Sequence, residues 1–106
     1  MSGSGIPIDD FDRALEVLAT GPGGIKQRLL RAWIAIVSVP ETMLPAGELR
    51  QQYLGLLDAV SYRAARGEEG RLAATIGRMS EDEAVRCARD LLRFWLKLRA
   101  AAGVPA

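Results

Sequence analysis

Histidine is absent from the 106-residue chain, and Cys87 is its only cysteine. The chain therefore lacks the commonest general base and the commonest metal ligand. One thiol alone forms neither an internal disulfide nor a CxxC metal or redox site. Segment 1–5 has no cationic start followed by an apolar stretch, as a secretory signal would. We therefore expect a reducing compartment, the cytoplasm.

Long hydrophobic runs and an excess of either charge are missing as well. The longest uninterrupted apolar run, 32–37, has six residues, far fewer than a membrane-spanning helix needs. Lys and Arg total 14 against 13 Asp and Glu, which excludes a strongly basic nucleic-acid binder at the level of the whole chain. Hydrophobic residues make up 49% of the chain, enough for the core of one small domain. The preference for Arg over Lys suggests a GC-rich bacterial genome.

The groups that nucleophilic catalysis uses have no partner to activate them. None of the serine and threonine hydroxyls can pair with a histidine, because the chain has none. Cys87 falls beside the apolar face of a predicted helix, where a buried and inert thiol is usual. The sequence therefore predicts a protein that is no enzyme and that uses no metal and no cofactor.

Glycine and proline interrupt the chain at short intervals, and between them the apolar residues recur at helical spacing. The run 34–39 also suits a short buried strand, but no other segment offers that strand a partner. We predict an all-α compact bundle of about five helices, with antiparallel neighbours joined by short loops. The bundle is expected to occupy 9–102, with flexible ends at 1–8 and 103–106. The predicted helices span about 10–20, 25–39, 45–66, 69–79 and 80–100.

Several helix starts carry characteristic residues. Asp9 is placed to cap the first helix, and Pro45 suits the first turn of the third. Ser80 followed three residues later by Glu83 is a capping box. The acidic clusters 9–12 and 81–83 stand at two of these starts, where the helix dipole favours negative charge. We therefore interpret both clusters as structural rather than as metal ligands.

The second predicted helix is apolar on every side over 32–37, and a helix of this kind must be covered on every side. The last helix also carries spare hydrophobes beside Trp95, which we expect in the core. One copy of the chain can bury such a helix, but we expect part of this surface to meet another chain. The residues expected at this contact are Trp33, Ile36, Phe94 and Leu96, with Arg89 and Arg93 as a polar rim.

Basic residues line one face of the last helix, at Arg86, Arg89, Arg93 and Lys97. Segment 71–106 holds seven basic and four acidic residues, so this face could contact phosphates or an acidic protein. The competing interpretation is a solvated face with local ion pairs. No aromatic residues alternate with the basic ones to stack on bases. A nucleic-acid-associated regulator is thus possible but not favoured.

A glycine-rich turn precedes the second helix. Such a turn can bind an anion through free backbone N–H groups, here with Gly23, Gly24, Lys26 and Arg28. The signal is weak, because no strand precedes the turn and the phosphate-loop motif is absent. A plain connection between two helices is the favoured interpretation of the turn.

The interpretation that combines these features is a small non-enzymatic protein–protein interaction module. Its partner is expected to be a second copy, which would give a homodimer, or a regulatory protein. A carrier of a small ligand is the third hypothesis, and it requires a concave pocket with convergent polar groups.

Overall fold

The computed structural model describes residues 6–62 and 67–103, and in these segments it contains five α-helices, one short 3-10 helix and no strand. The predicted all-α bundle is therefore confirmed. Of the predicted flexible ends, 1–8 and 103–106, the segments 1–5 and 104–106 lie outside the described residues. The helices are α1 (Ile8–Thr20), α2 (Ile25–Val37), η1 (Glu41–Met43), α3 (Glu48–Ser61), α4 (Gly67–Gly77) and α5 (Glu81–Ala101).

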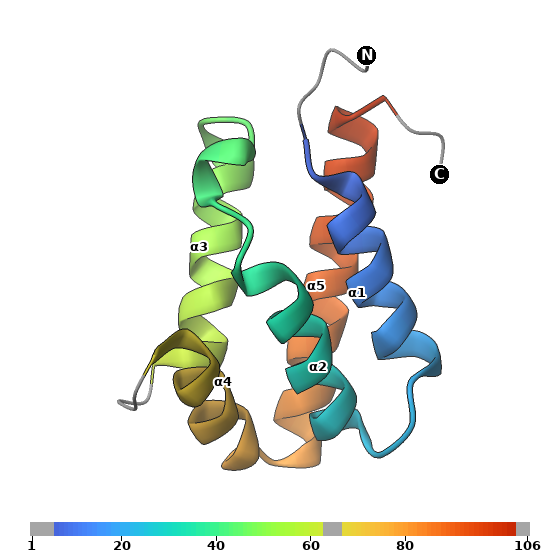
Figure 1. The fold of residues 1–106 in the computed structure, drawn as a ribbon, viewed down its shortest axis with the longest axis vertical. Coiled ribbons are helices and arrows are strands. Elements are labelled where there is room, and N and C mark those ends of the chain that lie inside the picture. Colours follow the sequence, from blue (N-terminus) through green and yellow to red (C-terminus); the bar gives the residue numbers. More distant parts are fainter. Residues whose placement is uncertain (1–5, 63–66, 104–106) are drawn as a thin grey trace.

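The long helix α5 runs behind α1 and α2 and is antiparallel to both α1 and α3 (Figure 1). Helix α2 lies in the middle, antiparallel to α1, and packs against α1, α4 and α5. The short helix α4 closes one end of the bundle between α3 and the start of α5. This arrangement places α1 and α5 side by side at one edge of the molecule.

Four aromatic rings from four helices form the centre of the core. Phe11 of α1 lies 5.9 Å from both Tyr53 of α3 and Phe94 of α5, measured between ring centroids. Tyr53 is also 5.8 Å from Trp33 of α2 and 6.0 Å from Phe94. Pairs at these separations are favourable beyond the burial of their area. The cluster therefore joins α1, α2, α3 and α5.

Three residues expected at a contact with another chain lie in this core instead. Trp33 and Phe94 are 1% and 3% exposed, and Ile36 is fully buried. The expectation was wrong because α1, α4 and α5 together cover most of α2, which one copy of the chain therefore shelters. At the edge of the covered region Ile34 remains 37% exposed.

The helix ends agree with the sequence only where capping is local. The Ser80 hydroxyl accepts from the Glu83 N–H and the Glu83 carboxylate accepts from the Ser80 N–H, as predicted. Helix α1 begins earlier than expected, at Ile8, and Pro7 precedes it, so Asp9 does not cap it. Helix α3 begins at Glu48 rather than near Pro45, because Gly47 takes φ +104°, a backbone conformation outside the right-handed helix.

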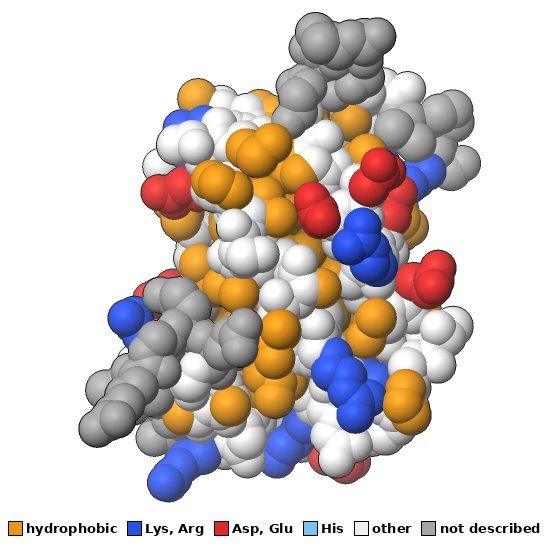
Figure 2. All heavy atoms as spheres, in the orientation of Figure 1, with side chains coloured by type: hydrophobic (Ala, Val, Ile, Leu, Met, Phe, Trp, Pro, Cys, Tyr) orange, Lys and Arg blue, Asp and Glu red, His pale blue; other side chains and the backbone are white. Residues whose placement is uncertain are grey.

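The face formed by α1, α2 and α3 carries few charges at its centre. Figure 2 shows hydrophobic and uncharged side chains along its middle, with charged side chains mostly over α1 and around the edges. Among the described residues, none of the helices combines the length and apolar composition that a membrane crossing requires.

Candidate partner-binding surface

Helix α5 exposes a stripe of hydrophobic side chains beside the face that it buries. Val85, Leu92 and Leu96 keep 41%, 42% and 46% of their surface exposed. Their spacings of seven and four residues place them on one side of the helix, with Arg89 between them. Of these three residues, only Leu96 was predicted at a contact with another chain. The other two also stay exposed, because the buried arc of α5 is narrower than its apolar arc.

The stripe borders an open groove of about 620 Å³ between α1 and α5. Leu15 and Leu18 of α1 and Ala88 of α5 are almost fully buried and form its floor. The groove is lined by Asp12, Leu15, Glu16, Leu18, Ala19 and Thr20 of α1 and by Val85, Ala88, Arg89, Leu92 and Trp95 of α5. We call the groove together with Leu96 the α1/α5 surface.

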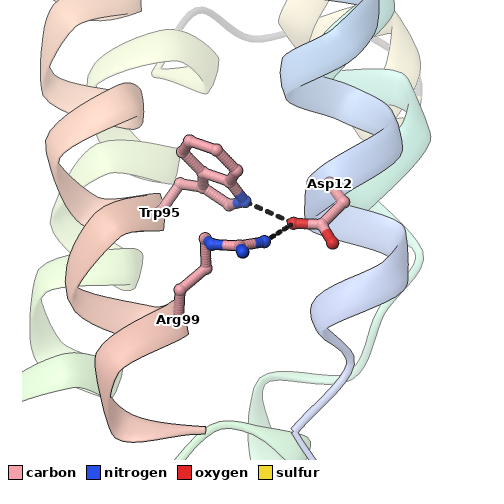
Figure 3. A network of polar contacts seen from close by, with 3 residues as sticks. All are labelled: Asp12, Trp95 and Arg99. Atoms are coloured by element: carbon pink, nitrogen blue, oxygen red, sulfur yellow. Dashed lines mark hydrogen bonds and ion pairs between the residues drawn. The ribbon is translucent and has the colours of Figure 1, made fainter. Parts of the chain in front are cut away.

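A hydrogen-bonded carboxylate fixes one end of the groove. Trp95 Nε1 and an Arg99 guanidinium nitrogen both donate to Asp12 Oδ1, at 2.6 and 3.0 Å. The Arg99 guanidinium also lies 5.0 Å from the centre of the Trp95 ring, within the range of a cation–π contact. Figure 3 shows both side chains reaching from α5 to Asp12 on α1. The contact holds α1 and α5 at a fixed spacing along the groove.

This contact corrects the interpretation of the first acidic cluster. Asp9 and Asp10 do lie in the first turn of α1, where the helix dipole favours them. Asp12, however, binds two side chains of α5 that are 83 and 87 residues away in the sequence. Its role is to join the two helices, and only the tertiary fold reveals this role.

Two opposite charges face the groove from its two walls. Glu16 stands exposed on the α1 wall and Arg89 on the α5 wall. Within the part of the chain that the structure describes, no side-chain hydrogen bond or ion pair engages either group. Both groups therefore remain able to pair with charges on a bound molecule.

The structure separates the predicted contact residues into two groups. Leu96, Arg89 and Arg93 are exposed on α5, as the prediction requires, whereas the other three are buried. Trp95, expected in the core, is only partly buried because it lines the groove. The other exposed large hydrophobics of the described segments, Ile34, Met43 and Tyr62, come from separate parts of the chain.

The residues of the weakly predicted anion site do not converge on one point. Lys26 Nζ donates to the carbonyl oxygens of Gly77 and Met79, both at 3.0 Å, where it caps the end of α4. Arg28 donates to the Leu18 carbonyl near the end of α1, at 3.1 Å. Cations stabilise helix C-termini, so these contacts hold α1, α2 and α4 together. Nothing in this geometry favours an anion at Gly23 and Gly24.

The turn nevertheless needs its glycine. Gly23 adopts φ +92°, a conformation that L side chains rarely take. A Cβ at this position would also overlap the Gln27 side chain. The turn is therefore shaped to connect α1 to α2.

Chemical groups suited to catalysis are sparse on the described surface. Partial burial, followed by the charges of Asp90 and Glu83, raises the pKa of the Cys87 thiol, which weakens it as a nucleophile. Within residues 6–62 and 67–103, no three His, Cys, Asp or Glu side chains gather where they could hold a metal ion.

The chain matches no known protein family, no curated protein and no solved structure. Its function therefore has to be inferred from the α1/α5 surface and from the distribution of charge around it.

Proposed function

We propose that this chain is a small non-enzymatic interaction module of the cytoplasm that binds another protein chain through its α1/α5 surface. The partner is a second copy or a regulatory protein. The observation that carries the proposal is the exposure of Val85, Leu92 and Leu96 on one side of α5, directly beside an apolar groove.

Exposed hydrophobic side chains that occur singly are normal, whereas a contiguous group beside a groove is typical of a contact site. Each Å² of apolar surface removed from water contributes about 25 cal/mol to binding. The groove offers only a few polar groups, and one of these, the Asp12 carboxylate, already binds Trp95 and Arg99. This composition suits an apolar contact better than an enzyme active site, which needs several convergent polar groups.

Affinity capture with a matched variant tests the proposal. The double variant Leu92→Glu/Leu96→Glu changes two exposed side chains, so its free energy of unfolding should stay within about 1 kcal/mol of wild type. Immobilised wild-type chain should retain a protein, or further copies of itself, from an extract of the organism that encodes it. The double variant should lose that protein, because charges would enter an apolar contact.

Two results together would contradict this function. The first is that both baits retain the same proteins in the same amounts. The second is that sedimentation equilibrium finds only monomer from about 5 to 500 µM, a range that detects micromolar self-association.

A nucleic-acid-associated regulator is the second candidate, and the exposure of four basic residues on α5 favours it. These residues are Arg86, Arg89, Arg93 and Lys97. Binding of this kind weakens steeply as salt rises, because bound counterions are released. The triple variant Arg86→Ala/Arg89→Ala/Arg93→Ala should then elute from a heparin or DNA column at clearly lower salt than wild type. Equal elution of the two proteins would exclude this candidate.

A further inference from the structure

We propose that the partner bound by the α1/α5 surface is an amphipathic helix of another protein, with apolar residues on one face and carboxylates along its edge. This inference rests on the proposed function, and it names the chemistry of the partner. Its support comes from the length of the exposed stripe and from the charges on either side of it.

The dimensions of the surface match one face of a helix. Residues 85 to 96 of α5 span three helical turns, or about 16 Å. The hydrophobic side chains follow the 4–3–4 spacing of a helix-packing seam, in which Arg89 takes one position. The groove beside them runs between two helices that lie side by side and stays open to solvent. A third helix can lie along it and cover both the groove and Leu96.

The edge of the stripe that faces away from α1 is predominantly basic. Arg86, Arg93 and Lys97 are exposed on this side of α5, and Arg89 stands in the stripe itself. Asp82 and Asp90 offset only part of this charge. A partner with carboxylates along its edge would pair with these groups, and the long stems of the arginines would add apolar contact.

The same charges disfavour a second copy as the partner. In an antiparallel twofold pairing of two α5 helices, the same edges meet, so the predominantly basic edge of one copy, which Asp82 and Asp90 offset only in part, lies beside that of the other. In a parallel twofold pairing, Arg89 of one copy lies beside Arg89 of the other. Like charges brought together in this way destabilise a contact. The stripe is therefore suited to a different chain.

A nucleic acid fits this surface less well than a protein helix. The middle of the surface is apolar, and its α1 wall carries the carboxylate of Glu16. The nearest aromatic side chain, Trp95, is partly buried, and its indole N–H is bound to Asp12. It is thus poorly placed to stack on bases.

A displayed peptide library tests the chemistry of the partner without assuming its identity. The library holds helical peptides of about 18 residues, five turns long. Four leucines stand at alternating spacings of four and three, and the other positions are drawn at random from Ala, Gln, Glu and Lys. The full-length wild-type chain is the bait. Peptides that also bind the Leu92→Glu variant are discarded, because they bind outside the α1/α5 surface.

We expect wild-type bait to enrich peptides in which Glu outnumbers Lys by about threefold or more beside the leucines. The affinity of the most enriched peptide is then measured by fluorescence anisotropy. Arg89→Glu should weaken its binding about tenfold or more, since both charge pairing and packing are lost. Arg78→Glu makes the same charge change on an exposed residue between α4 and α5, and it should alter the affinity less than about twofold.

Each other outcome overturns the inference in a distinguishable way. Enriched peptides without a preference for Glu would refute the acidic partner and leave the interaction function intact. A dimer of the chain that dissociates when Leu92 is replaced by Glu would likewise refute the acidic partner and leave the interaction function intact. A DNA duplex that binds through Arg89 as tightly as the peptide does would assign the surface to nucleic acid. The absence of any enrichment over the Leu92→Glu bait would refute the amphipathic-helix partner, while the capture and sedimentation experiments described above decide the interaction function separately.

Discussion

At the scale of single residues, Trp33 and Leu96 show how similar sequence signals lead to opposite environments. Both are large hydrophobic residues in apolar stretches of a helix, yet Trp33 is 1% exposed and Leu96 is 46% exposed. The difference depends on which neighbouring helix covers each position. Local spacing does not contain this information, so the sequence placed both residues in the same predicted contact.

Substitution of these two residues should therefore have very different effects on stability. Trp33→Ala should lower the free energy of unfolding by about 3–5 kcal/mol, because it removes a large buried side chain and leaves a cavity beside Tyr53. Leu96→Ala should change it by less than about 0.5 kcal/mol, as expected of an exposed position. Urea unfolding followed by circular dichroism measures both. Similar losses in the two variants would contradict the burial described here.

Asp12 should be the most sensitive acidic residue of α1. Asp12→Ala removes the acceptor of Trp95 and Arg99. The Asp12 side chain is 39% exposed, so we expect a loss of only about 1–2 kcal/mol in the free energy of unfolding. Asp10→Ala is the matched control, because the 4.0 Å pair of Asp10 with Arg13 is more exposed to solvent. Equal effects of the two substitutions would argue against a link between α1 and α5 through Asp12.

At the scale of elements, prediction succeeded where the deciding contacts are local. Ser80 and Glu83 are three residues apart, and their reciprocal hydrogen bonds follow from the sequence alone. Lys26, by contrast, caps α4 from a position 51 residues before Gly77. The start of α3 follows Gly47 at φ +104°, which the prediction based on Pro45 did not anticipate. The cap that Lys26 places on α4 thus depends on the tertiary fold, whereas the start of α3 depends on a local backbone conformation that Pro45 does not reveal.

The capping box should give α5 a specific dependence on pH. The hydrogen bond from the Ser80 N–H, and then the bond with its side chain, lower the pKa of Glu83 below its usual value of 4.5. A lowered pKa in the folded state stabilises the fold at pH values above 4.5, and this contribution is lost as the pH falls through the folded-state pKa. Glu83→Gln should therefore be less stable than wild type at neutral pH, with the difference shrinking in acid.

Urea unfolding at a series of pH values between about 2 and 7 checks this dependence, since it covers the range in which carboxyl groups titrate. Glu81→Gln changes a neighbouring carboxylate outside the capping box, so the stability of that variant should follow the pH dependence of wild type more closely. A Glu83→Gln deficit that is the same at all pH values would contradict the proposed role of the carboxylate.

At the scale of the whole molecule, helical spacing was sufficient to predict an all-α bundle, because no segment offered a strand partner. The location of the uncovered hydrophobic surface was not predictable in the same way. Helix α2 looked hardest to bury, yet α1, α4 and α5 surround it. Helix α5 was expected to expose Phe94 and Leu96, yet it buries Phe94 and leaves Val85 and Leu92 exposed together with Leu96. Which faces stay open depends on the packing order of the helices, which spacing alone does not specify.

The central claim is that these exposed side chains serve contact with another chain rather than folding. The most direct measurement is a titration of ¹⁵N-labelled chain with the most enriched library peptide, followed by amide chemical shifts. We predict that the shifts change along the groove side of α1 and over residues 85–96 of α5, while the amides of α4 stay unchanged. Changes centred on α3 or α4, or no change at saturating peptide, would contradict the claim.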